Sequence, residues 1–222
     1  MNSPRLATAT GLAIFLCAIL VVVCYLFVDA PVALWVQRNF TREGRWLEPE
    51  TDVIPYVVFG APFIVVALLV WRRWYKWQHW QLTVVAAMLN LLATALLKQG
   101  LKWVFGRPWP TTWIGDNPSL INDGVYDFDW FHGGLVFGSF PSGHTTATVA
   151  IASILWIAYP KLRWLAVLAA ATMVVALVGN NYHFVGDCVA GAFLGSIGGA
   201  WTAHLLGLQA NTVRDSEAVA ET

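Results

Sequence analysis

The sequence predicts an all-α, polytopic membrane protein with six transmembrane helices and a long extracytoplasmic loop between the third and the fourth. Of its 222 residues, 58% are hydrophobic and only 12% are charged, whereas a soluble domain carries roughly 25% charged residues. Thirteen tryptophans suit a protein with two membrane–water interfaces, where indole rings gather. Several apolar stretches approach the about 20 residues that a helix needs to cross a bilayer core.

Six apolar stretches account for the predicted spans. The first is longer than the apolar core of a signal peptide, and no clear small-residue cleavage site follows it, so we interpret it as a span. The fourth and fifth are short, and their predicted ends are uncertain by several residues. The stretches are 6–28, 53–71, 82–104, 144–159, 164–180 and 185–208.

The distribution of basic residues predicts the orientation. Arg72, Arg73 and Lys76 lie among aromatic residues in the short segment between the second and third stretches, a pattern typical of a cytoplasmic turn. Both termini are then cytoplasmic, and the loop 106–141 faces outward. We expect residence in the cytoplasmic (inner) membrane of a bacterium, because the chain is short and has no targeting extension, with the site facing the periplasm or the exterior.

The rest of the composition limits the organisation and the partners. We expect one domain over residues 1–210 and a disordered polar tail over 211–222. The formal net charge of zero gives no indication of a nucleic-acid partner, so the expected partners are the lipid bilayer and a lipid. The three cysteines lack the spacing of a metal site or of a disulfide framework.

The segment Pro141-Ser142-Gly143-His144 opens the fourth stretch. Serine is a favoured N-cap, and the free N–H groups and dipole of a helix start attract anions. Gly143 leaves room for a phosphate beside the backbone, and His144 projects from the first turn. On this segment alone, an ordinary helix cap with a surface histidine is an equally good interpretation.

His183 and Asp187 stand four residues apart just before the sixth stretch. On a helix such residues share one face, so the carboxylate can hold one ring nitrogen and leave the other as a nucleophile or base. Such a pair alone is more often structural. Its catalytic interpretation gains support because His144 is predicted on the same side of the membrane.

Lys102 and Arg107 lie at the outer end of the third stretch. They suit phosphate binding, with lysine as a point charge and arginine as a bidentate fork. Considered without the histidines, they are equally typical of interfacial anchors that reach toward lipid head groups.

The order of these motifs over residues 82–208 resembles the type 2 phosphatidic acid phosphatase (PAP2) superfamily, whose members carry K-x6-R-P, then P-S-G-H, then S-R-x5-H-x3-D. The resemblance implies that His183 forms a phosphohistidine and that Asp187 orients it. It further implies that His144 protonates the leaving oxygen, while Ser142 and Gly143 hold the phosphate.

Two positions depart from the family pattern. Trp109 stands where the first motif has its arginine, and Ala176-Leu177 replaces the Ser-Arg pair of the third motif. We expect Arg107, with Lys98 as a further candidate, to substitute for the first arginine. Asn180 or Asn181 is the candidate substitute for the second.

The leading functional prediction is hydrolysis of a lipid phosphate or diphosphate, with no cofactor. The loop also contains five acidic or histidine residues, but their spacing matches no metal motif, so no metal is expected: Asp116, Asp123, Asp127, Asp129 and His132. Two alternatives remain open at this stage. One is transfer of the phosphoryl group to an acceptor lipid, and the other is a non-catalytic lipid-binding or transport protein, which the missing arginines favour.

Overall fold

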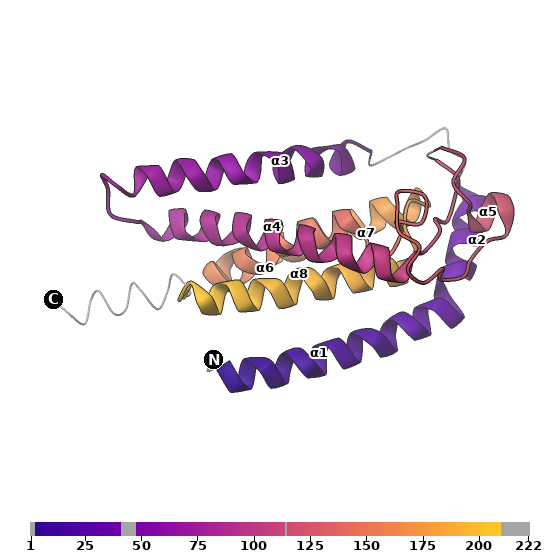
Figure 1. Cartoon of the computed structure of the whole chain (residues 1–222), viewed down its shortest axis with the longest axis horizontal. Helices are drawn as coiled ribbons and strands as arrows, with labels where there is room; N and C mark the ends of the chain where they lie inside the picture. Colours follow the sequence, from indigo (N-terminus) through magenta and orange to yellow (C-terminus); the bar gives the residue numbers. More distant parts are fainter. Residues whose placement is uncertain (1–2, 41–47, 114, 210–222) are drawn as a thin grey trace.

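In a computed structural model of the chain, residues 3–40, 48–113 and 115–209 are described. Regular structure in these ranges is helical, and two isolated β-bridges occur in the loop before α6. Figure 1 shows the helices side by side along one axis, with the long loop and α5 at one end. The helices are α1 (Ser3–Val23), η1 (Cys24–Val28, π-helical), α2 (Asp29–Asn39), α3 (Glu48–Trp71), α4 (His79–Phe105), α5 (Leu120–Asp123), α6 (Gly143–Ala158), η2 (Pro160–Leu162, 3-10), α7 (Arg163–Gly179) and α8 (Val185–Leu205).

The predicted all-α membrane fold is confirmed, and each of the six apolar stretches coincides with a long helix. By length and hydropathy, five helical segments in the described part of the chain suffice to cross a bilayer. The remaining one, α6, is apolar but shorter, at 16 residues. The count of six crossings therefore stays a prediction for α6, and the predicted polar tail 211–222 lies outside the described residues.

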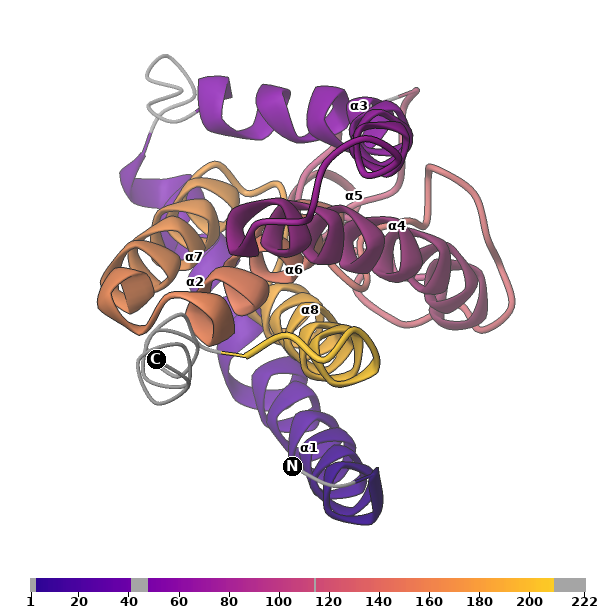
Figure 2. The ribbon, with the colours of Figure 1, turned by 90° about the vertical axis from the view of Figure 1, so that its left-hand side faces the viewer.

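α6 is the central helix, surrounded by α4, α7 and α8 in the end-on view of Figure 2. Small residues allow α8 to approach it closely. A Cβ added to Gly191, Gly195 or Gly199 would lie 2.7, 2.8 or 2.0 Å from atoms of α6 or of its N-cap. This repeat of glycine every four residues is the small-residue spacing that brings membrane helices into backbone contact.

A buried polar side chain joins α4 to this pair. Asn90 is fully buried, and its Nδ2 donates to the carbonyl oxygens of Ala150 at 2.9 Å and Gly195 at 3.2 Å. A buried amide needs such partners, because an unpaired polar group in an apolar interior is costly. The three helices α4, α6 and α8 therefore have a fixed relative position, and the first turns of α6 and α8 lie close together.

The N-terminal segment bends where its membrane span ends. α1 packs along α8, where Trp201 Nε1 donates to Thr10 Oγ1 at 2.9 Å. The π-helical turn follows, and α2 then runs across the loop end of the bundle (Figure 1). The sequence analysis did not predict α2. Its consequence is that Asp29, the first residue of α2, is brought to the interior.

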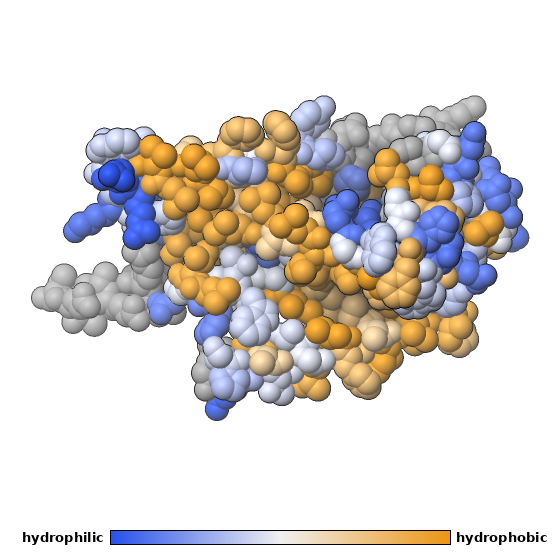
Figure 3. Space-filling model, in the orientation of Figure 1, coloured by the Kyte–Doolittle hydropathy of each residue, from blue (hydrophilic) through white to orange (hydrophobic). Residues whose placement is uncertain are grey.

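The surface agrees with a protein embedded in a bilayer. Large apolar side chains point outward from α1 and α3, among them Phe15 at 66% and Phe63 at 65% exposure. In Figure 3, hydrophobic residues cover the middle of the visible face, and hydrophilic residues gather toward its two ends. An apolar band of this size would be exposed to water unless lipid covered it, so it indicates contact with a bilayer.

Candidate active site

The segments that carry the two predicted histidines are bound to each other through the backbone. Ser142 N donates to Asp187 O at 3.0 Å, which joins the start of α6 to the first turn of α8. The preceding loop is held in turn, because Ser139 N donates to Arg107 O at 3.0 Å. The three sequence motifs thus converge at one end of the bundle, as the sequence predicts.

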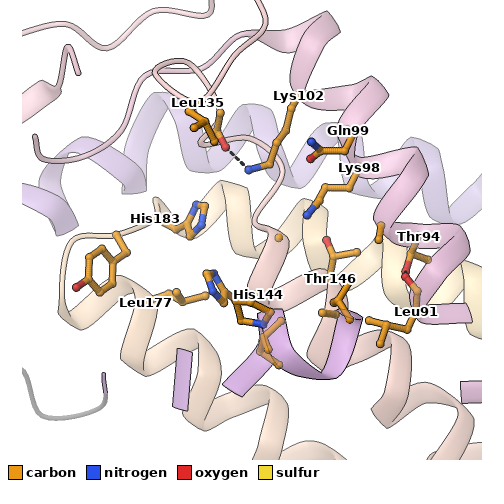
Figure 4. Close-up of a pocket in the computed structure, with 18 of the residues that line it drawn as sticks. Leu91, Thr94, Lys98, Gln99, Lys102, Leu135, His144, Thr146, Leu177 and His183 are labelled. Atoms are coloured by element: carbon orange, nitrogen blue, oxygen red, sulfur yellow. Dashed lines mark hydrogen bonds between the residues drawn. The ribbon is translucent and has the colours of Figure 1, made fainter. Parts of the chain in front are cut away.

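A cavity of about 910 Å³ opens at this end. This volume lies within the usual range of ligand pockets, roughly 300–1,000 Å³. Its polar lining includes Lys98, Lys102, His144 and His183, and Figure 4 shows these side chains around a common space. Its apolar lining includes four residues of α3, namely Ile54, Pro55, Val58 and Phe59.

His183 is almost completely buried, at 3% exposure, yet it lines the cavity. It precedes α8, and Asp187 stands in the first turn of that helix. His183 Nδ1 lies 3.5 Å from Asp187 Oδ2, and within the described part of the chain no atom makes a hydrogen bond with it. A small rotation would close this contact to a hydrogen bond.

The second histidine enters from the start of α6. His144 lies 6.5 Å from His183, measured between ring centroids. Ser142 is the N-cap, as predicted, because its Oγ accepts from Thr145 N at 3.3 Å. The Ser142 side chain is fully buried and does not line the cavity, whereas Gly143 does.

Two lysines on successive turns of α4 supply positive charge to the cavity. Lys102 Nζ donates to the carbonyl oxygen of Gly138 and lies 5.4 Å from the centre of the Trp109 ring. Lys98 Nζ lies over the start of α6, because a Cβ added to Gly143 would be only 3.0 Å from it. An ammonium group beside a helix N-terminus creates a strongly electropositive site.

Arg107 lies outside the cavity, which differs from its predicted place beside the phosphate. Its side chain is fully buried and does not line the cavity. Nη1 donates to Asp187 Oδ1 at 2.6 Å, and Nη2 donates to Asp29 Oδ2 at 2.8 Å. Both amino groups are thus engaged with carboxylates behind the histidine.

The asparagines proposed as substitutes for the second arginine also point elsewhere, so that prediction is wrong in this structure. Asn180 Nδ2 donates to Ala176 O at 2.8 Å, within its own helix end. Asn181 is buried, and its Nδ2 donates to Ala33 O of α2 at 3.1 Å. Neither asparagine lines the cavity.

Burial and neighbouring charge shift the pKa of His183. Burial is the largest influence and lowers the pKa below the ordinary value of 6.5, although Asp187 opposes this change. The imidazole therefore stays neutral at neutral pH. A neutral imidazole has the free lone pair that a nucleophile needs.

Three residues of this site were missed by the sequence analysis as site residues. Ser139 Oγ donates to Asp187 Oδ2 at 2.6 Å. Asp29 binds Arg107, and Trp109 packs against the imidazole of His183 with ring centroids 5.0 Å apart. Asp29 had a usable signal, because an acidic residue at the end of an apolar span is rare and often functional, and Trp109 had one in its position within the first family motif.

A comparison of the sequence with known families identifies the family of this chain. The sequence model of one protein family, described as the PAP2 superfamily, matches residues 83–209. This chain belongs to the PAP2 superfamily. The match includes α6, α7, α8, the site loop and nearly all of α4, but it excludes α1, α2 and α3.

The remaining comparisons add a distant likeness. The PAP2 chain is similar to the crystal structure of a transmembrane PAP2 type phosphatidylglycerolphosphate phosphatase from Bacillus subtilis. Identity is 18%, coverage is 88% of this chain and 94% of that chain, and the TM-score is 0.47. No curated protein matches the chain significantly.

Proposed function

We propose that this PAP2 protein hydrolyses a lipid phosphate or lipid diphosphate through a phosphohistidine intermediate. One observation carries the proposal. Two histidines and two lysines line the same cavity of about 910 Å³ to which α3 contributes an apolar wall. Basic and nucleophilic groups suit a phosphate, and an apolar wall suits the rest of a lipid.

The two histidines have separate roles in this reaction. His183 Nε2 attacks the phosphorus while the bond from phosphorus to the leaving oxygen breaks, and protonated His144 gives its proton to that oxygen. His144 then takes a proton from water, the resulting hydroxide attacks the phosphorus, and the phosphorus–nitrogen bond breaks to release inorganic phosphate. The 6.5 Å between ring centroids leaves room for a phosphoryl group between the rings.

The lysines stabilise the charge on the transferring group. Phosphoryl transfer depends mainly on positioning and on electrostatic stabilisation of the phosphate oxygens. Lys98 and Lys102 both line the cavity, and Lys98 Nζ lies beside Gly143 at the start of α6. We therefore assign phosphate binding to this lysine pair and to the α6 N-terminus, in place of the family arginines.

A lipid suits the cavity better than a small soluble ester. The α3 wall faces the outer surface of the bundle, where Phe59 is 76% exposed. A hydrocarbon tail that leaves the cavity past α3 therefore passes directly into the bilayer. The head group stays at the polar end of the cavity, where the histidines are.

The proposed orientation places the cavity at the outer face of the cytoplasmic membrane of a bacterium. The basic loop with Arg72, Arg73 and Lys76 lies between α3 and α4, at the opposite end of the bundle from the site loop. A cysteine introduced at the exposed Trp130 should react with a membrane-impermeant maleimide in intact cells. Reaction only after lysis would reverse the orientation.

The decisive experiment measures inorganic phosphate released by the detergent-purified protein from a panel of lipid phosphates and diphosphates. We expect release from at least one lipid, abolished in His183→Ala and retained in His204→Ala. His204 is a matched control, because it lies near the other end of α8 and pairs with Ser3. A newly phosphorylated lipid in place of free phosphate would indicate phosphotransfer, and no product at all would indicate a non-catalytic protein.

A further inference from the structure

Asp29 is a buried acidic residue that the reaction above leaves without a role. It is 1% exposed and begins α2, directly after the π-helical turn. Its Oδ2 accepts from Arg107 Nη2, and its Oδ1 accepts from Gly186 N, both at 2.8 Å. Asp29 thus contacts the site from a helix that the family model does not include.

Arg107 connects Asp29 to the residue behind the nucleophile. Each of its amino groups binds one carboxylate, that of Asp29 or that of Asp187. The guanidinium carbon lies 4.2–5.6 Å from the centres of four aromatic rings, which favours a fixed cation. Those rings belong to Phe184, Phe128, Tyr126 and Tyr25.

Asp187 is in turn held in one orientation. Besides Arg107, its carboxylate accepts from Ser139 Oγ at 2.6 Å and from Phe184 N at 3.0 Å. The oxygen that receives these two bonds, Oδ2, is also the one 3.5 Å from His183 Nδ1. A displacement of Arg107 would therefore move the Asp187 carboxylate, and through it change the contact with the His183 imidazole.

The approach of Asp29 depends on the absence of a side chain at Gly186. A Cβ at that position would lie 2.9 Å from Asp29 Oδ2 and 3.2 Å from Cys24 Cβ. Gly186 stands between Phe184 and Asp187 in the first turn of α8. Asp29 thus holds both the backbone that carries Asp187 and the cation that binds its carboxylate.

We propose that Asp29 is a positioning residue for phosphoryl transfer, which keeps the Asp187 carboxylate oriented and negatively charged toward His183 by sharing Arg107. The inference rests on the proposed function. One cation between two anions leaves a net negative charge, which supports the positive charge that develops on His183 as it attacks. Without Asp29, the arginine would neutralise Asp187 alone, and the imidazole would become a weaker nucleophile.

The other charged groups around His183 stay the same when Asp29 changes. They are Lys98 and Lys102 from α4 and His144 from α6, all lining the same cavity. Variants of Asp29 and Arg107 therefore leave the charged groups on the cavity side unchanged. This arrangement allows the charge to be varied in steps and its effect to be measured on His183.

The test uses Asp29→Asn, Arg107→Gln and the double variant in the full-length protein, with the pH dependence of kcat and KM as the main measurement. Asp29→Asn removes one negative charge without changing size. It should lower kcat about 10- to 100-fold, as outer partners of a reacting or metal-bound histidine do, with a smaller effect on KM. The acid limb of the profile should move to lower pH. Arg107→Gln should move it to higher pH, and the double variant should return it close to the wild-type position.

The ring nitrogen shifts of ¹⁵N-labelled His183, assigned with His183→Gln, provide the same titration without turnover. They separate the two proposals, because a wild type that releases no phosphate would refute the proposed function while the titration still tests Asp29. Asp127→Asn is the control, since Asp127 is exposed and contacts Tyr25 rather than Arg107. If Asp29→Asn does not fold, the test rests on Arg107→Gln and the double variant. The acid limb of the double variant should then lie at lower pH than that of Arg107→Gln. An unchanged acid limb and unchanged His183 titration across the series would overturn the positioning role.

Discussion

Two clusters of charge flank the His183–Asp187 pair, and they are built in opposite ways. On the cavity side, Lys98 and Lys102 line an open space of about 910 Å³. On the other side, Arg107 is fully buried between the carboxylates of Asp29 and Asp187. The first cluster presents its charge to the cavity, and the second holds the Asp187 carboxylate in place.

The difference shows that sequence motif and residue type do not decide the role of a cation. Lys102 and Arg107 belong to one short motif at the end of α4. Gly106 ends the helix between them with a φ of +51°, and a Cβ there would lie 1.9 Å from Asp129 O. The chain therefore turns away after the helix, and Arg107 points inward while Lys102 stays on the cavity face.

The largest effect on stability is expected from Arg107→Ala, which removes the cation of the buried cluster. Two buried carboxylates would lose the arginine that pairs with both of them, and breaking such a pair typically costs about 3–5 kcal/mol of folding free energy. We expect a large fall in the thermal unfolding temperature in detergent. Arg38→Ala, at an exposed position of α2, should change stability by less than about 0.5 kcal/mol. Equal effects of the two variants would contradict the distinction between buried and open cations.

The open cluster should respond in the opposite manner. Lys102→Ala and Lys98→Ala each remove a charged hydrogen bond of about 1.5–3 kcal/mol to the phosphate, which corresponds to an about 10- to 100-fold lower kcat/KM. Their unfolding temperatures should stay near that of the wild type. Lys161→Ala, in the turn before α7, is the matched control. A loss of stability without a loss of turnover would assign these lysines to the structural cluster.

The pH dependence sharpens the comparison further. Burial lowers the pKa of His183 below 6.5, and the neutral form is the nucleophile that we propose, so we expect activity to be present above the lowered pKa and lost as the pH falls through it. Burial also lowers the pKa of Arg107, but Asp187 and Asp29 together raise it above its ordinary value. The acid limb of kcat/KM should therefore lie below pH 6.5 and report His183. An acid limb above that value would mean that another group controls the reaction.

The smallest effect is expected at the boundary between the clusters. Trp109 packs on His183 and donates from Nε1 to Leu135 O at 2.9 Å. Trp109→Phe keeps an aromatic ring against the imidazole but removes this hydrogen bond, which contributes about 1 kcal/mol. Unfolding should shift by a few degrees and turnover by only a small factor. A large loss of turnover at unchanged stability would place Trp109 in direct contact with the substrate.

The positions of the membrane helices and the residue types gathered at the candidate site were predictable, because both follow from local sequence patterns. Hydropathy located each long helix to within a few residues at most ends, and the Ser142 cap followed from residue preference. The turn Cys24–Val28 and helix α2 were not predictable in this way. The helical segment runs on from Ser3 to Asn39 although the first apolar stretch ends at Val28, so hydropathy did not indicate α2, and the bend depends on packing against α8 and the loop.

The sequence by itself determined that this is an all-helical membrane protein of the PAP2 superfamily and that His144, His183 and Asp187 form the centre of the candidate site. Only the tertiary structure decided which cations face the cavity. The sequence does not separate the roles of Arg107 and Lys102, because both are cations in one short motif. A buried cation is stable only where carboxylates surround it, and here these come from distant segments. Asp29 and Asp187 lie far apart in the chain, and their meeting at Arg107 depends on how α2 and α8 pack.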